Sequence, residues 1–212
     1  MLNLFFTAVL FFLISFHSVP VNSDELRETK SWNYFAYGGQ FTATDLMPIL
    51  FRQSTDYKDS YIAVLGANRE TDFRIRFFQF ETELNAVKHF GEMNHFEGNG
   101  LYSARVKNLF YLPMSFAFGE GLSIASENPR LENKSKGIYF ENYQFLIQSK
   151  GIESRNILNF IMVELDYGLS KSFYDSKIFM RIHHRSGVFG LLCPPDPACG
   201  SNFVSYGIKF TL

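Results

Sequence analysis

Apolar and polar residues alternate along several stretches of this chain, which is the pattern of β-strands with two different faces. The alternation is clearest between residues 73 and 107, where two long runs are separated by the turn sequence GEMN. It returns between residues 177 and 212, where two runs flank a connection rich in Gly, Pro and Cys. With the weaker candidates, eight strands are predicted, at residues 32–44, 60–68, two within 73–107, 114–126, 156–168 and two within 177–212.

The connections between these runs are less regular. Residues 45–59 carry mixed signals, and residues 68–72 (NRETD) are predicted to form a short polar turn. Residues 138–148 fit either a helix or an extra strand. Eight strands make the smallest closed barrel, in which side chains rather than water fill the interior.

The long strands have one polar and one apolar face, and two folds fit this pattern. A soluble barrel of the lipocalin kind turns its apolar face inward, whereas a membrane barrel turns it toward lipid. The period of the pattern does not say which face is outside. We favour an all-β, eight-stranded antiparallel transmembrane β-barrel of the outer membrane, because the chain ends on an alternating strand with apolar side chains at Tyr206, Ile208, Phe210 and Leu212.

Composition agrees with a barrel that faces lipid. The chain has 212 residues, which suits one domain, and aromatic residues make up 17% of it against 19% for charged residues. Twenty basic and 21 acidic side chains nearly cancel, so the charge gives no indication of a nucleic-acid partner.

The N-terminus predicts export. Residues 4–16 form an apolar run of 13 residues followed by polar, turn-prone residues, which is short for a membrane helix and typical of a signal peptide. Cleavage after Ser23 would leave residues 24–212 as a single barrel domain, and an uncleaved anchor is the alternative. Beyond residue 24 no apolar run reaches the roughly 18 residues of a membrane helix, so we expect strands to cross the membrane.

The chain has two cysteines, Cys193 and Cys199, and both lie in the last connection. In an oxidising compartment we expect them to form a disulfide, and two unpaired thiols are the alternative. Two thiolates without further ligands supply only half of a tetrahedral zinc shell, so we predict no metal site.

One pair of side chains in the penultimate run suggests chemistry. His184 and Ser186 are two residues apart on a strand, so they project from the same face within a few ångströms of each other. A serine hydroxyl becomes a nucleophile when an adjacent base accepts its proton. His-x-Ser also occurs by chance, so the pair alone is weak evidence.

The opposite face of the same run is predicted to be structural. His183 falls on the polar side with Arg181 and Arg185, which places it in the interior of a membrane barrel rather than beside Ser186. The two arginines are expected to pair with interior acids, for which the candidates are Glu81, Glu83, Glu97, Glu164 and Asp166. Glu164 and Asp166 could also be paired catalytic acids, but a packing role is favoured.

A resemblance sharpens the hypothesis for the outer pair. The stretch RIHHRSGVFG with the following turn and closing strand, and more loosely LPMSFAFGEGLSIAS and LNFIMVELDYG, resembles the PagL-type lipid A 3-O-deacylases over about the C-terminal half of the chain. The resemblance implies that Ser186 is the nucleophile and His184 the general base. Asn202 stands where the family has the glutamate that orients the histidine, and Gly187 stands where it has an asparagine, which leaves the Gly187 N–H as the oxyanion donor.

The resemblance also implies the setting of the reaction. The substrate would be the acyl ester of lipid A or lipopolysaccharide, reached from among the outer-membrane lipids of a Gram-negative bacterium, and no cofactor would be needed. The sequence leaves a homodimer open. The rival hypothesis is a non-catalytic outer-membrane barrel with a structural or surface-interaction role.

Overall fold

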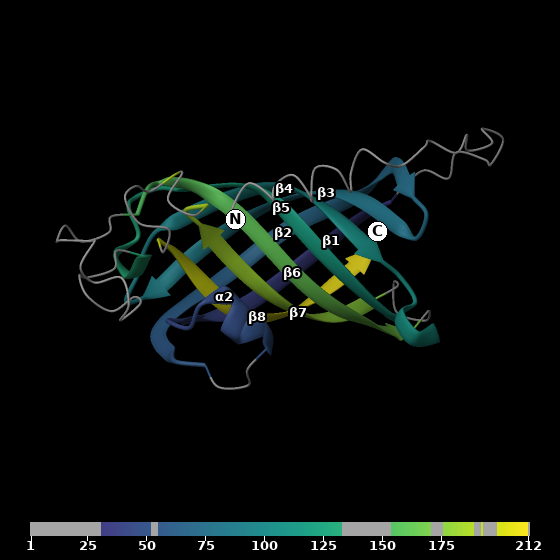
Figure 1. Ribbon diagram of the computed structural model, residues 1–212, viewed down its shortest axis with the longest axis horizontal. Helices are drawn as coiled ribbons and strands as arrows, with labels where there is room; N and C mark the ends of the chain where they lie inside the picture. The colour runs from purple at the N-terminus through teal and green to yellow at the C-terminus, as the bar shows by residue number, and fades with distance from the viewer. Residues whose placement is uncertain are drawn as a thin grey trace, which may run out of the picture. The chain divides into compact units, whose positions relative to one another are not determined.

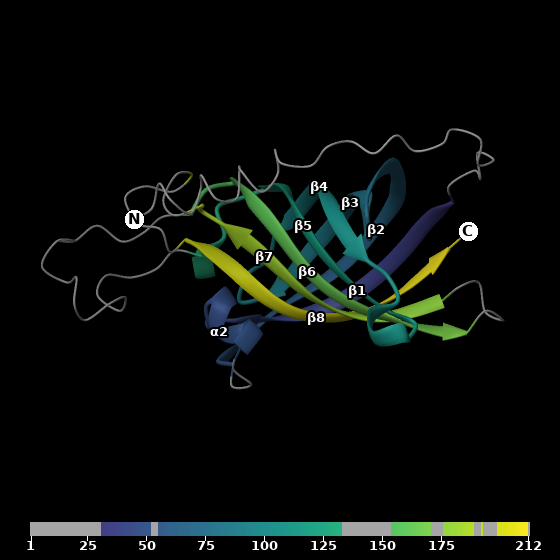
Figure 2. The same ribbon diagram turned by 45° about the vertical axis from the view of Figure 1, so that its right-hand side comes forward.

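A closed antiparallel β-barrel accounts for nearly all of the regular structure. The computed structural model describes residues 31–51, 55–132, 154–170, 176–188, 192 and 199–211. Within these ranges each strand pairs with its neighbours in the chain, and the last pairs with the first (Figures 1 and 2). The eight strands are β1 (Trp32–Thr42), β2 (Tyr57–Ile75), β3 (Phe78–Gly91), β4 (Phe96–Val106), β5 (Met114–Ala125), β6 (Ile157–Ser170), β7 (Ser176–Ser186) and β8 (Gly200–Thr211).

The described parts of the connections contain three short helical segments. Helix α2 (Leu46–Phe51) lies between β1 and β2, and the 3₁₀ turns η1 (Leu109–Tyr111) and η2 (Arg130–Glu132) follow β4 and β5. Among the described residues, no helix combines the length and apolar character that a membrane crossing requires. The predicted signal peptide at residues 1–23 and the uncertain segment at residues 138–148 lie outside the described residues.

The strand assignments agree with the prediction except in the second strand. The polar turn predicted at residues 68–72 is wrong, because β2 continues to Ile75 and turns at Arg76, where φ is 51°. Asn68 lies opposite Glu83 in the ladder, and its side-chain amide donates to Glu81 at 2.9 Å. The stretch is polar because some of its side chains point to polar groups inside the barrel. Turn propensity does not take this environment into account, so it predicts a turn here.

Side-chain burial shows which face of the barrel is outside. The interior holds an aromatic and apolar cluster that includes Phe35, Tyr37, Ile62, Phe179 and Phe203. It also holds charged side chains that are at most 4% exposed, namely Glu81, Glu83, Glu97, Arg105, Glu132, Glu164, Asp166, Arg181, Arg185 and Lys209. The exterior is apolar, with side chains between 46% and 70% exposed at Leu65, Leu84, Phe96, Tyr102, Phe118, Ile124, Ile178, Tyr206 and Ile208. A soluble protein rarely exposes so much contiguous apolar surface, whereas a lipid-facing wall requires it. The chain is therefore a transmembrane β-barrel, and the lipocalin-like alternative is excluded.

Ion pairs hold the interior together. The Glu164 carboxylate accepts from Arg105 at 2.7 Å, from Arg181 at 2.9 and 2.5 Å, and from Lys209 at 2.7 Å. Arg181 also pairs with Glu83 at 2.6 Å, as the sequence predicted, and Arg105 pairs with Glu81 at 2.8 Å and with Asp166. Charges this deeply buried are tolerated only when each has partners of opposite charge. Because the paired residues lie on different strands, the network links β3, β4, β6, β7 and β8 across the lumen.

A charge placed on the outer wall should destabilise the barrel in a bilayer. Leu84 lies near the middle of β3 and is 68% exposed. We expect Leu84→Arg to lower the free energy of unfolding in phospholipid vesicles by about 2–4 kcal/mol, the cost of an arginine near the bilayer midplane. Urea titration followed by tryptophan fluorescence measures it. The matched control is Tyr111→Arg, in a turn where the side chain is fully exposed, and equal stability of the two variants would contradict the lipid-facing assignment.

Candidate active site

Strands β7 and β8 bring the predicted site residues to one place on the outer wall. His184 lies directly opposite Asn202, and Ser186 lies opposite Gly200. Opposed residues in an antiparallel ladder project from the same face, so all three side chains share the face that carries Ile178 and Tyr206. His184 and Ser186 are half-buried and Asn202 is buried. Gly200 has φ of 130°, and a Cβ there would lie 2.0 Å from the Arg185 carbonyl oxygen, so only glycine lets β8 begin this close to β7.

The ring of His184 is oriented by a backbone carbonyl. Its Nδ1 lies 3.1 Å from the carbonyl oxygen of Ser201, on the facing strand. A carbonyl oxygen only accepts hydrogen bonds, so this contact assigns the proton to Nδ1 and the lone pair to Nε2. This is the tautomer that a general base needs. Sequence reasoning did not find Ser201 in this role, because a backbone carbonyl leaves no trace in residue type.

The hydroxyl of Ser186 and the N–H of Gly187 have backbone partners at the end of β7. Ser186 Oγ accepts from the Val188 N–H at 3.2 Å, and the Gly187 N–H donates to the Cys199 carbonyl at 3.1 Å. Val188 has φ of 50°, an unusual value for a β-branched residue, so the turn after Ser186 is strained. Gly187, the predicted oxyanion donor, therefore uses its N–H in a hydrogen bond that joins the end of β7 to the start of β8.

Asn202 is opposite His184 in the ladder, but its amide serves another element. Its Nδ2 donates to the Thr44 carbonyl at 3.0 Å, in the connection that leads from β1 into helix α2. The Oδ1 atom of Asn202 has no hydrogen-bond partner among the described residues. The amide therefore fastens the β1–β2 connection to the wall beside the histidine.

His183 points into the barrel, as predicted from its place on the opposite face. Its Nδ1 lies 2.8 Å from the Tyr37 hydroxyl, and its Nε2 lies 3.1 Å from Glu97. Arg185 also points inward, but its carboxylate partner is Glu132, at 2.7 and 2.8 Å, rather than one of the acids predicted for it. Glu132 lies in η2, a turn with no alternating pattern, and so the sequence did not indicate it.

Two further histidines lie in the interior near the β3–β4 turn. His89 and His95 stack with their ring centroids 3.9 Å apart, and His89 Nε2 lies 2.7 Å from Glu97. Burial, together with the neighbouring His89, lowers the pKa of His95 to about 4, so its ring is neutral at pH 7. Both histidines belong to the polar face that the alternation predicted.

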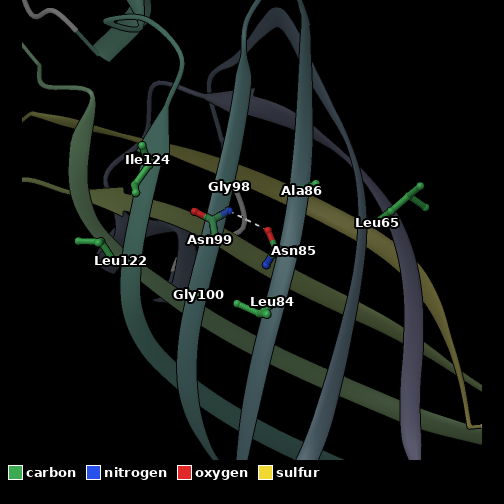
Figure 3. Close-up of a pocket in the computed structure, with 9 residues that line it drawn as sticks. All are labelled: Leu65, Leu84, Asn85, Ala86, Gly98, Asn99, Gly100, Leu122 and Ile124. Carbon is green, nitrogen blue, oxygen red and sulfur yellow. Dashed lines mark hydrogen bonds between the residues drawn. The ribbon is translucent and has the colours of Figure 1, made fainter.

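A second part of the outer wall is hollowed into an open apolar depression (Figure 3). Its floor lies at Gly98 and Gly100 of β4, and a Cβ at Gly98 would meet no atom within 4 Å. Its rim is formed by Leu65, Leu84, Leu122 and Ile124. In a bilayer such a depression is filled by acyl chains, and it lies on β2 to β5, away from the β7–β8 pair.

Fold and wall together define a transmembrane β-barrel with a His-x-Ser pair on its lipid-facing side. No protein-family model and no curated protein matches the chain. Several solved structures are similar in fold, including the following two. Neisserial surface protein A (NspA) is 10% identical, with 85% of this chain and 97% of that one covered and a TM-score of 0.47. The outer membrane enzyme PagL is 11% identical, with 85% and 99% covered and a TM-score of 0.46. Likeness at this level carries no argument about the site, so the inferences below rest on this chain's own residues.

Proposed function

We propose that this protein is an acyl-ester hydrolase of the lipid A 3-O-deacylase type in the outer membrane of a Gram-negative bacterium. The observation that carries the proposal is that His184 and Ser186 lie on one face of β7, with His184 Nδ1 oriented by the Ser201 carbonyl at 3.1 Å. The lipid-facing wall supports a substrate that arrives from the bilayer, such as lipid A or lipopolysaccharide. The export signal at residues 1–23 belongs to the same proposal.

The proposed reaction proceeds through an acyl-enzyme. Ser186 Oγ attacks the ester carbonyl while His184 Nε2 accepts its proton. The tetrahedral intermediate then loses the sugar alkoxy group, whose oxygen takes the proton from the imidazolium and leaves as a hydroxyl. A water molecule then gives a proton to His184 Nε2 and attacks the acyl carbon. The imidazolium returns that proton to Ser186 Oγ as the acyl–oxygen bond breaks, which releases the fatty acid and free Ser186. The Gly187 N–H can stabilise the oxyanion once its bond to the Cys199 carbonyl opens. The nucleophile, the general base and the oxyanion donor of this scheme are all residues of the chain.

The orienting group is the main departure from the resembling family. In place of a carboxylate, a backbone carbonyl accepts the Nδ1–H of His184, and Asn202 bonds to Thr44 instead. A carbonyl fixes the tautomer but carries no full charge, so it stabilises the imidazolium less than a glutamate would. We therefore expect a slower enzyme than one with an acid at this position. The proposed Cys193–Cys199 disulfide would hold the connection beside Gly187, and Cys193 lies outside the described residues.

Mass spectrometry of lipid A tests the proposal. Refolded protein incubated with lipid A in detergent micelles is expected to release one ester-linked hydroxyacyl chain and to leave the amide-linked chains in place, because an amide is a poorer electrophile than an ester. A protein-free incubation gives the background. Lipid A of unchanged mass after incubation with the folded barrel would contradict the proposal.

A second candidate function is a non-catalytic barrel. The hydrogen bonds of Ser186, Gly187 and Asn202 to backbone groups favour it, since each stabilises the end of the β7–β8 hairpin without a substrate. In that case the His-x-Ser pair would be structural, and the loops would carry the interactions of the protein. The lipid A experiment separates the two candidates, because only the hydrolase changes the mass of the lipid.

A further inference from the structure

Three side chains in the interior of the barrel carry the ligand atoms of a metal site. His89 lies near the end of β3, Glu97 lies near the start of β4, and His95 lies in the turn between these strands. All three are at most 4% exposed, and one potential ligand atom from each lies within 4.8 Å of the others. We propose that His89, His95 and Glu97 bind a divalent transition-metal ion of the Zn²⁺ class.

The ring nitrogens of the two histidines are the first support for the site. Among the described residues, neither Nδ1 nor Nε2 of His95 has a hydrogen-bond partner, and neither does Nδ1 of His89. Burial of a polar group without a partner costs free energy, so interior groups are normally paired. Three unpaired nitrogens on two stacked rings are an exception, and a bound cation would use one lone pair from each ring, since a neutral imidazole has a single one.

The donor set fits the chemistry of zinc. Two imidazoles and one carboxylate are ligands that Zn²⁺ takes, with a fourth position for water. At Zn–N distances of about 2.0–2.1 Å, tetrahedral ligand atoms lie roughly 3.3 Å apart, so the three donors must approach by on the order of 1 Å. The ring of His95 belongs to a turn residue rather than to a paired strand residue, and its rotation can supply this movement.

The carboxylate of Glu97 is held by neighbours on other strands. Its Oε1 lies 3.1 Å from His183 Nε2 and accepts from Ser123 Oγ at 2.9 Å. Its Oε2 lies 2.7 Å from His89 Nε2, a contact that places the proton of that ring on Nε2 and leaves the lone pair for the metal on Nδ1. Partners of this kind orient a ligating carboxylate and raise metal affinity. The metal would neutralise Glu97 and fasten the β3–β4 end to β5 and β7 inside the barrel.

Equilibrium dialysis of the full, untagged and refolded barrel against ZnCl₂ tests the site, with bound zinc measured by elemental mass spectrometry. We expect about one Zn²⁺ per chain, and a loss of affinity of at least about tenfold in His95→Ala and in Glu97→Gln. His184→Ala is the matched control, because it removes a histidine from the outer wall and should bind zinc like the wild type. Circular dichroism checks that each variant keeps its β-structure.

Two results would overturn the site: a wild-type barrel that takes up no zinc, or a folded His95→Ala variant that binds as tightly as the wild type. If His95→Ala does not fold, X-ray absorption of the zinc-loaded wild type decides. Two imidazole ligands at about 2.0–2.1 Å would support the site, and zinc without imidazole ligands would refute it. Because the readout is metal content, a failure of the proposed ester hydrolysis would leave this result unaffected.

Discussion

Replacement of Glu164 by glutamine is expected to lower the free energy of unfolding by about 3–5 kcal/mol, the usual cost of removing one partner from a buried ion pair. Glu164 is fully buried and is the carboxylate that Arg105, Arg181 and Lys209 share. Glutamine keeps the shape but not the charge, and its amide nitrogen cannot accept. The three cations would remain in the lumen without the anion between them, and water is poorly able to replace it there.

Guanidinium unfolding in detergent micelles, followed by far-ultraviolet circular dichroism, measures this loss. The matched control is Glu120→Gln, which removes a carboxylate from the outer wall, where Asn159 donates to it at 3.2 Å. That variant should lie within about 1 kcal/mol of the wild type, as exposed polar contacts usually do. Equal midpoints for the two variants would show that the interior network does not stabilise the barrel.

Much of the fold could be predicted because a strand in a two-faced sheet records its environment in every second residue. The β3–β4 hairpin was predicted because Phe78 and Phe80 alternate with Gln79 and Glu81. Alternation does not show which face of the strands is inside, since the same period describes a barrel with a polar interior and one with an apolar interior. Burial of Glu164 and exposure of Leu84 supply that direction. Residues 68–72 were predicted to form a turn because they are polar, but they belong to β2, and their polarity reflects side chains that point into the barrel interior.

The candidate site was predictable only where it depends on the face of a strand. The common face of His184 and Ser186, and the separation of His183 from them, follow from a period of two. Hydrogen-bond partners from the backbone do not, so the orienting carbonyl of Ser201 was not foreseen. Contacts between distant elements also escaped, including Glu132 with Arg185. The ring stacking of His89 and His95 depends on how the hairpin closes, which their sequence spacing does not report.

The largest functional effect should come from the outer pair itself. If Ser186 is the nucleophile and His184 the base, Ser186→Ala and His184→Ala should each lower the rate of ester cleavage on the order of a thousandfold or more. Groups that act as a unit are strongly non-additive, so the double variant should retain about the same residual rate as either single variant. Independent effects would instead multiply, and the double variant would then be far slower than both.

Initial rates of hydroxyacyl release from lipid A, measured by mass spectrometry on refolded protein, distinguish these patterns. Met180→Ala is the matched control, because Met180 lies on the same outer face of β7 and is 41% exposed. It removes more side-chain volume than Ser186→Ala does, yet it should leave the rate within a few fold of the wild type. A Ser186→Ala barrel that cleaves lipid A as fast as the Met180→Ala barrel would exclude Ser186 as the nucleophile. The contact of His184 with Ser201 would then be a structural feature of the hairpin.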